Sequence, residues 1–154
     1  MEIRFRPIGV VHSPFEARED IPRYRCFEPQ GYGDVQGELE IFKEFQEGLQ
    51  DIEGFSHIIL LFAFHKSEIR SLTAHPPYDG RKRGVFSTRS PHRPNPLGAT
   101  VLKLVRREGN VLKVLGVDMI EGTPILDIKP YTPRDLKKDA EFGWLEEFTP
   151  KPGK

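Results

Sequence analysis

The sequence predicts a mainly β protein: a small closed or partly open β-barrel with one or two short helices. Runs of alternating or β-branched residues recur along the chain, as in half-buried strands. The 14 glycines and 14 prolines place turn signals at short intervals between these runs. Helical periodicity is confined to one short stretch. At 154 residues, the chain is expected to form one domain with its own core.

Three strands and a helix are expected in the first half of the chain. Residues 3–11 (IRFRPIGVV) and 38–42 (ELEIF) alternate between apolar and polar positions. Residues 55–65 (FSHIILLFAFH) form a nearly continuous apolar run, which is typical of a strand covered on both faces. Residues 42–52 (FKEFQEGLQDI) offer about two amphipathic turns of helix.

The second half is expected to add strands only. Residues 84–89 (GVFSTR) predict a short strand. Residues 99–120 predict two strands joined by a hairpin turn at 108–110 (EGN), where Gly and Asn tolerate positive φ. Residues 123–131 (TPILDIKPY) alternate again, and residues 149–154 are expected to be a flexible tail.

Composition excludes several classes of protein. The single cysteine, Cys26, cannot form an internal disulfide, which fits a reducing cytoplasm, and no motif around it favours a nucleophile. No stretch approaches the roughly 20 apolar residues of a membrane span, and the N-terminus lacks the apolar run of a signal peptide. We therefore expect a soluble cytoplasmic protein that does not enter a membrane.

Two familiar motifs are absent. Residues 31–37 (GYGDVQG) resemble a dinucleotide fingerprint, but the spacing is wrong by one and a strand follows where a phosphate-binding helix is needed. The five histidines show no metal-ligand spacing, so no metal is predicted. His57, inside an apolar strand, is expected to be a core histidine. His65 ends that strand before Lys66, where polar groups at the mouth of a barrel are typical.

Positive charge is concentrated in one part of a chain whose net charge is zero. Between residues 80 and 107 there is no acidic residue. This range holds eight bases: Arg81, Lys82, Arg83, Arg89, Arg93, Lys103, Arg106 and Arg107. The run is either a solvated face or a site for an anion such as phosphate, carboxylate or an RNA backbone.

The proline-rich part of this run is the strongest candidate for function. Residues 84–100 read GVFSTRSPHRPNPLGAT. Proline disfavours the α conformation in the residue before it, so we expect a stiff, polyproline-like rod from Ser90 to Pro96. Such a rod would hold the guanidinium groups of Arg89 and Arg93 ready for bidentate binding of an anion. The alternative is a rigid connector with solvated arginines.

A second polar segment lies at residues 116–131 (GVDMIEGTPILDIKPY). Asp127 is flanked there by Leu and Ile. It is either paired with Lys129, two residues on, or it is an acid or base tuned for catalysis.

Four strings, in order, resemble the TsaA-like family, also called YaeB or VirR proteins. They are IGVVHSP, GFSHIILLFAFHK, GVFSTRSPHRPNPLG and DMIEGTPILDIKPY. The resemblance implies a single TsaA-like β-barrel domain over residues 1–148, rather than a Rossmann-like fold, and a homodimer. It also implies a tRNA methyltransferase that uses S-adenosylmethionine. The methyl group would go to the exocyclic nitrogen of the adenosine beside the anticodon, position 37, already carrying a threonylcarbamoyl group.

The resemblance also assigns site residues. It implies cofactor contacts at His65, Lys66, Arg93, Leu97, Leu126, Asp127, Ile128 and Lys129. Asp127 and His65 are the candidates for taking up the proton that leaves the nitrogen. The expected contacts with RNA phosphates are Arg81, Lys82, Arg83 and Arg89.

Some features leave room for other functions. The loop at residues 16–38 is longer than in the family and differs from it in sequence, so no contact is assigned to it. Some members carry an additional C-terminal domain, whereas this chain stops just after the expected barrel. A non-catalytic RNA-binding β-barrel would use the same basic run, and a metal-dependent hydrolase around His65 and Asp127 is a third possibility.

Overall fold

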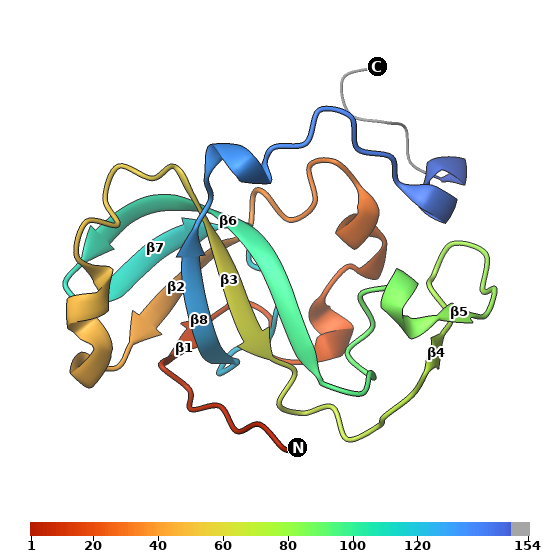
Figure 1. The fold of residues 1–154 in the computed structure, drawn as a ribbon, viewed down its shortest axis with the longest axis horizontal. Helices are drawn as coiled ribbons and strands as arrows, with labels where there is room; N and C mark the ends of the chain where they lie inside the picture. Colours follow the sequence, from red (N-terminus) through yellow and green to blue (C-terminus); the bar gives the residue numbers. More distant parts are fainter. Residues whose placement is uncertain (149–154) are drawn as a thin grey trace.

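A closed six-stranded barrel forms the centre of the molecule in the computed structural model, which describes residues 1–148. The strand order around it is β1-β2-β7-β6-β3-β8, with every neighbouring pair antiparallel. The strands are β1 (Gly9–His12), β2 (Gln36–Ile41), β3 (His57–Ala63), β6 (Leu97–Glu108), β7 (Val111–Leu115) and β8 (Pro124–Pro130) (Figure 1). Closure leaves the barrel itself without a free edge strand, and it confirms the predicted fold class.

Smaller elements gather beside the barrel. A separate two-stranded sheet pairs β4 (Thr73–Ala74) with β5 (Arg83–Gly84). The helices assigned within residues 1–148 are all 3-10 helices: η1 (Arg18–Asp20), η2 (Arg23–Phe27), η3 (Lys43–Leu49), η4 (Val85–Ser87), η5 (Pro133–Asp135) and η6 (Gly143–Glu147). Figure 1 shows η1, η2, η4 and the small sheet on one side of the barrel, next to β6. None of the described helices is long and apolar enough to cross a membrane.

The barrel interior is filled by one side of each strand. Along β3, Ile58, Leu60 and Phe62 point inward and are buried, while the residues between them are half-buried on the outer face. The expected cover on both faces of this strand is therefore only partial. His57 belongs to the outer face, where its Nδ1 lies 2.8 Å from Ser56 Oγ, so the expectation of a core histidine is wrong.

Three expected elements differ from the structure. The first predicted strand, 3–11, begins too early. β1 covers Gly9–His12, and Ile8 before it still bonds through its backbone to Ile125 and Phe42. Ile3 and Phe5 are exposed, and Pro7 has no N–H to donate to a ladder. Residues 84–89 turn into η4, because Thr88 N donates to Val85 O at 3.0 Å. The predicted helix at 42–52 is the 3-10 helix η3, which lacks a side-chain cap at its N-terminus.

The other strand predictions are confirmed. The β6–β7 hairpin turns at Gly109, whose φ of 63° is the left-handed conformation that glycine adopts without strain. Strand β8 lies within the predicted range 123–131. The predicted flexible tail, 149–154, lies outside the described residues.

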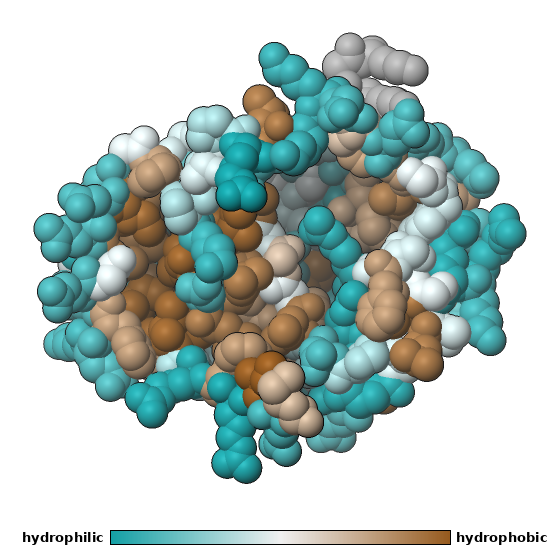
Figure 2. All heavy atoms as spheres, viewed as in Figure 1, coloured by the Kyte–Doolittle hydropathy of each residue, from teal (hydrophilic) through white to brown (hydrophobic). Residues whose placement is uncertain are grey.

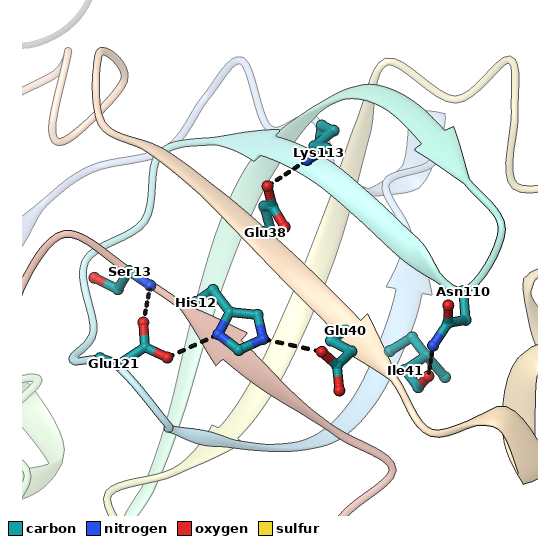
Figure 3. Close-up of polar contacts among 8 residues, drawn as sticks. All are labelled: His12, Ser13, Glu38, Glu40, Ile41, Asn110, Lys113 and Glu121. Carbon is teal, nitrogen blue, oxygen red and sulfur yellow. Dashed lines mark hydrogen bonds and ion pairs between the residues drawn. The ribbon is translucent and has the colours of Figure 1, made fainter.

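Polar contacts connect the strands where the barrel meets solvent (Figure 3). His12 Nδ1 lies 2.7 Å from Glu121 Oε1, and its Nε2 lies 3.2 Å from Glu40 Oε1. The hydrogen bond with Glu121 raises the pKa of His12 despite partial burial. In turn, the N–H of Ser13 donates to Glu121 and lowers the pKa of that carboxyl. Lys113 pairs with Glu38 on the neighbouring strand.

Candidate functional site

A cavity of about 900 Å³ lies between the barrel and the loops beside it. Residues from 16–32, 64–77, 88–93, the first part of β6 and the segment 118–123 line this space. Figure 2 shows the hollow beside the barrel, with hydrophilic and hydrophobic residues mixed on its loop side. The volume suits a ligand the size of a nucleoside cofactor.

The barrel contributes an apolar part of the cavity wall where β6 begins. Gly98 of β6 pairs with Phe62 of β3, and the phenyl ring lies directly over the glycine. A Cβ at position 98 would lie only 2.3 Å from the Phe62 ring. Phe64 packs edge-on against Phe62, with ring centroids 5.1 Å apart. Glycine at 98 therefore allows the two aromatic side chains to shape this wall.

The proline segment forms another wall, but it is not the expected rod. It curls through tight turns, in which Arg93 N donates to Pro91 O at 3.1 Å and Leu97 N donates to Asn95 O at 2.7 Å. Arg93 also binds its own loop, because Nη1 donates to the carbonyl oxygens of Thr88 (2.9 Å) and Ser90 (3.2 Å). The Nε and Nη2 groups of Arg93 have no acceptor among residues 1–148, which leaves two donors for an anion.

A histidine joins three of the loops around the cavity. Arg18 Nη1 lies 2.8 Å from His92 Nε2, and a guanidinium can only donate, so Nε2 must accept. His92 Nδ1 therefore carries the hydrogen and donates to Ser67 Oγ at 2.7 Å. Burial lowers the pKa of His92, and the charge of Arg18 adds to this effect. Sequence reasoning missed this link, because Arg18 and Ser67 lie in irregular segments distant from His92.

Part of the predicted cofactor set meets at this cavity. His65, Lys66, Arg93 and Leu97 all line it. β3 ends at Ala63 rather than at His65, and His65 and Lys66 follow after Phe64, at the end of the barrel where the cavity opens. Burial lowers the pKa of His65, and the charge of Lys66 lowers it further. The ring is therefore neutral at physiological pH.

The rest of the predicted cofactor set lies elsewhere. None of Leu126, Asp127, Ile128 and Lys129 lines the cavity; all four belong to β8. Asp127 pairs with Leu61 of β3 in register and is half-exposed on the outer barrel face. Its Oδ2 lies 3.0 Å from Lys129 Nζ, and its Oδ1 accepts from Ile128 N. This ion pair confirms the pairing alternative for Asp127.

The basic run is divided between two surroundings. Arg83 forms an ion pair with Asp79 at 2.8 Å and lies 4.1 Å from the centre of the Trp144 ring, so its side chain is only 13% exposed. Arg81 and Lys82, by contrast, are exposed between β4 and β5. Arg89 is exposed at the rim of the cavity. A smaller cavity of about 470 Å³, beside exposed Phe86, shares Arg89 with the larger one.

Asp118 and Cys26 are two of the ionisable groups at the cavity that sequence reasoning did not select. Asp118 is held by Thr100, whose Oγ1 lies 2.9 Å from each carboxylate oxygen, and burial raises the pKa of Asp118 to about 6. Burial also raises the pKa of Cys26 to about 11, so its thiol stays protonated and is a poor nucleophile. Residues 1–148 contain no cluster of three or more His, Cys, Asp or Glu side chains suited to a metal ion.

Comparison with known proteins matches the resemblance seen in the sequence. Residues 10–135 match the family model of the tRNA-methyltransferase O N-terminal domain. A probable S-adenosyl-L-methionine-binding protein of Pyrococcus abyssi is 47% identical over 146 residues, 94% of this chain and 77% of that protein. A rat tRNA (adenine(37)-N6)-methyltransferase is 43% identical over 152 residues, 94% of this chain and 35% of that enzyme.

A solved structure agrees with the barrel. The crystal structure of TrmO from Pseudomonas aeruginosa superposes with a TM-score of 0.75 at 38% identity, covering 93% of this chain and 62% of that one. The chain thus spans less than two thirds of this structure and about a third of the rat enzyme. From the family match, the identities and the shared barrel, we conclude that the chain belongs to the tRNA-methyltransferase O N-terminal domain family.

Proposed function

We propose that this protein is a tRNA methyltransferase that uses S-adenosylmethionine. Its target would be the exocyclic nitrogen of adenosine 37, carrying a threonylcarbamoyl group. The observation that carries the proposal is the cavity, which gathers His65, Lys66, Arg93 and Leu97 within a chain of this family. Relatives named for S-adenosyl-L-methionine binding and for tRNA (adenine(37)-N6) methylation support the same reading.

The residues at the cavity fit this cofactor. The two free donors of Arg93 suit the carboxylate of its methionine part, because a guanidinium binds carboxylates in bidentate fashion. The apolar wall of Phe62 and Leu97 suits the adenine ring. When bound, the cofactor supplies a methyl group bonded to a positively charged sulfur. The task of the chain is to hold the attacking nitrogen behind that methyl group, at about 3–3.5 Å, and to exclude water.

The predicted proton acceptors differ in their positions. His65 lies at the cavity with a neutral ring, whereas Asp127 is on the outer face with Lys129. Within one chain, only His65 of this pair is placed to take up a proton from a substrate in the cavity.

The proposed RNA contacts are Arg81, Lys82 and Arg89. All three are exposed, and Arg89 lies between the two cavities, where a phosphate next to the target nucleotide would need a cation. The side chain of Arg83 is already occupied by Asp79 and Trp144, so we assign it to holding this region together. The target base would leave its stack to enter the larger cavity.

We further propose that the protein acts as a homodimer in the cytoplasm. Val101 and Val105 of β6 are each 48% exposed on the outer barrel face, and Leu97 on the same face also lines the cavity. Figure 2 shows apolar side chains gathered over this front of the barrel. We propose that a second copy packs on this face with its β8 toward the cavity, which would reunite the two parts of the predicted cofactor set. Sedimentation of a Val101→Asp variant as a monomer, against a dimeric wild type, tests this.

Labelled transfer tests the function directly. The pure protein is incubated with methyl-labelled S-adenosylmethionine and tRNA lacking the methyl group at adenosine 37, and the digested nucleosides are identified by mass spectrometry. Label on the exocyclic nitrogen of residue 37 supports the proposal, and comparing tRNA with and without the threonylcarbamoyl group decides the substrate. A non-catalytic RNA-binding barrel would instead bind tRNA without binding the cofactor in calorimetry.

A further inference from the structure

The cavity wall holds a carboxylate with acceptor capacity to spare. Asp118 follows β7, and Thr100 of β6 is its side-chain partner. A hydroxyl has one hydrogen to donate, whereas a carboxylate offers about four acceptor positions. No salt bridge reaches Asp118 from the residues that the structure describes. Part of its hydrogen-bonding capacity is therefore available to a molecule in the cavity, which Asp118 lines together with His65 and Arg93.

The groups that face Asp118 come from three elements. The hydroxyl of Thr100 on β6 stabilises the ionised form most, followed by the charge of Arg89 in the proline segment and a backbone hydrogen bond. Cys26 and Tyr32, from the loop before β2, also interact with it electrostatically, and burial raises the pKa of both. Both therefore stay neutral at physiological pH. Burial outweighs these three stabilising interactions and raises the pKa of Asp118 to about 6. The carboxylate is therefore ionised at neutral pH yet binds a proton readily.

We propose that Asp118 accepts the proton that leaves the exocyclic nitrogen of the substrate adenosine, an inference that rests on the proposed function. The N–H of this nitrogen donates a hydrogen bond to a free position on the carboxylate. The bond between nitrogen and the methyl carbon forms while the carbon–sulfur bond breaks, and the electron pair of that bond stays on sulfur. The proton passes to Asp118 and then to solvent, so that atoms and charge balance.

Asp118 is better placed for this role than the two acceptors predicted from the sequence. Asp127 lies outside the cavity of its own chain. Its carboxylate is already bound to Lys129 and to a backbone N–H, so it has less acceptor capacity to offer even where β8 of a second copy approaches a cavity. His65 is at the barrel mouth, where the adjacent charge of Lys66 disfavours the protonated ring. Asp118 gains a proton without creating a new buried charge, because protonation neutralises it.

Single-turnover transfer with saturating cofactor and undermethylated tRNA tests the role. Asp118→Asn keeps the shape and an acceptor for Thr100 but cannot take up a proton, so the rate is expected to fall about 100-fold. Calorimetry should give the wild-type affinity for S-adenosylmethionine. The control is Glu108→Gln, an exposed carboxylate at the opposite end of β6, paired with Arg106, which should retain the wild-type rate. An Asp118→Asn rate within threefold of wild type overturns the proposal.

Two pH measurements separate Asp118 from His65. The carbon NMR signal of the Asp118 carboxyl in the ligand-free protein should titrate near pH 6, and a midpoint near 4 overturns the proposal. The wild-type rate should rise through the same midpoint, and His65→Gln should keep this rise while Asp118→Asn loses it; the reverse result overturns the proposal. A wild type that binds the cofactor but methylates no tRNA refutes the proposed function, whereas equal rates for wild type and Asp118→Asn refute the role of Asp118 alone.

Discussion

Adding one methyl group at Gly98 tests whether the aromatic wall of the cavity depends on the absence of a side chain there. In Gly98→Ala the new Cβ would lie 2.3 Å and 2.5 Å from two atoms of the Phe62 ring, far inside van der Waals contact. The backbone at 98 needs no positive φ, so strain comes from this clash alone. The ring is buried on its barrel side, and the free space lies in the cavity. We therefore expect the ring to move into the cavity.

The magnitude follows from two opposing effects. Overpacking a core position costs about 1–3 kcal/mol, and replacing glycine by alanine recovers about 0.4–1 kcal/mol by restricting the unfolded chain. The net loss should be about 1–2 kcal/mol, because the cavity gives the ring somewhere to go. For a domain of this size that lowers Tm by about 2–8 °C. The displaced ring should also weaken binding of S-adenosylmethionine about tenfold.

The assay is urea unfolding followed by fluorescence, with calorimetry for the cofactor. Gly48→Ala is the matched control: no atom lies within 4 Å of its new Cβ, and no positive φ is required, so stability should stay equal or rise. Gly98→Ala combined with Phe62→Leu removes the clashing ring and should be less destabilised than the sum of the two single changes. If Gly98→Ala is as stable as Gly48→Ala and binds cofactor normally, the reasoning is refuted.

Three further predictions concern charge. Arg93→Ala should weaken S-adenosylmethionine binding at least tenfold by calorimetry, because the two free donors are lost, and unchanged affinity would rule out this assignment. Arg81→Ala with Lys82→Ala should lower tRNA affinity and reduce the slope of log K against log salt by about two, without changing cofactor affinity; an unaltered slope contradicts the RNA contact. The pKa of His12 is raised in the folded protein, so the stabilisation from His12 is complete below pH 6.5 and is lost as pH rises through the folded-state pKa. The pKa of Glu121 is lowered, so the stabilisation from Glu121 is complete above pH 4.5 and is lost as pH falls through its folded-state pKa. Urea unfolding between pH 4 and 9 should therefore show His12→Gln losing the alkaline decline, and an unchanged decline would contradict the role of His12.

The alternation of apolar and polar residues, together with turn residues, was enough to predict most of the barrel strands. The hairpin at Gly109 and strand β8 follow from alternation and turn residues, which act over a few neighbouring positions. Residues 3–7 alternate equally well but lie outside β1, because alternation alone does not show whether a partner strand is present. In the proline segment, Arg93 binds carbonyl groups of its own loop, which curls back toward it. The backbone preferences of proline do not predict such a side-chain contact.

The candidate site was predicted in part for a similar reason. His65, Arg93 and Leu97 belong to sequence motifs that resemble the family, and the structure brings them to one cavity. Asp118 lies in such a motif too, but its importance depends on burial and on Thr100, eighteen residues away. Arg18 belongs to a loop without pattern, so its bond to His92 could not be inferred from spacing.

The position of the site follows from the closure of the barrel. Six strands enclose an interior occupied by buried apolar side chains such as Leu60 and Leu102, as is usual for a small barrel. A binding site on such a barrel must be built outside, from loops, and loops need fixed contacts to hold a shape. The bonds from Arg18 and Ser67 to His92, together with the carbonyl contacts of Arg93, supply this order. Binding is thus separated from the core, which explains how a chain of net charge zero can carry a cationic site on one side.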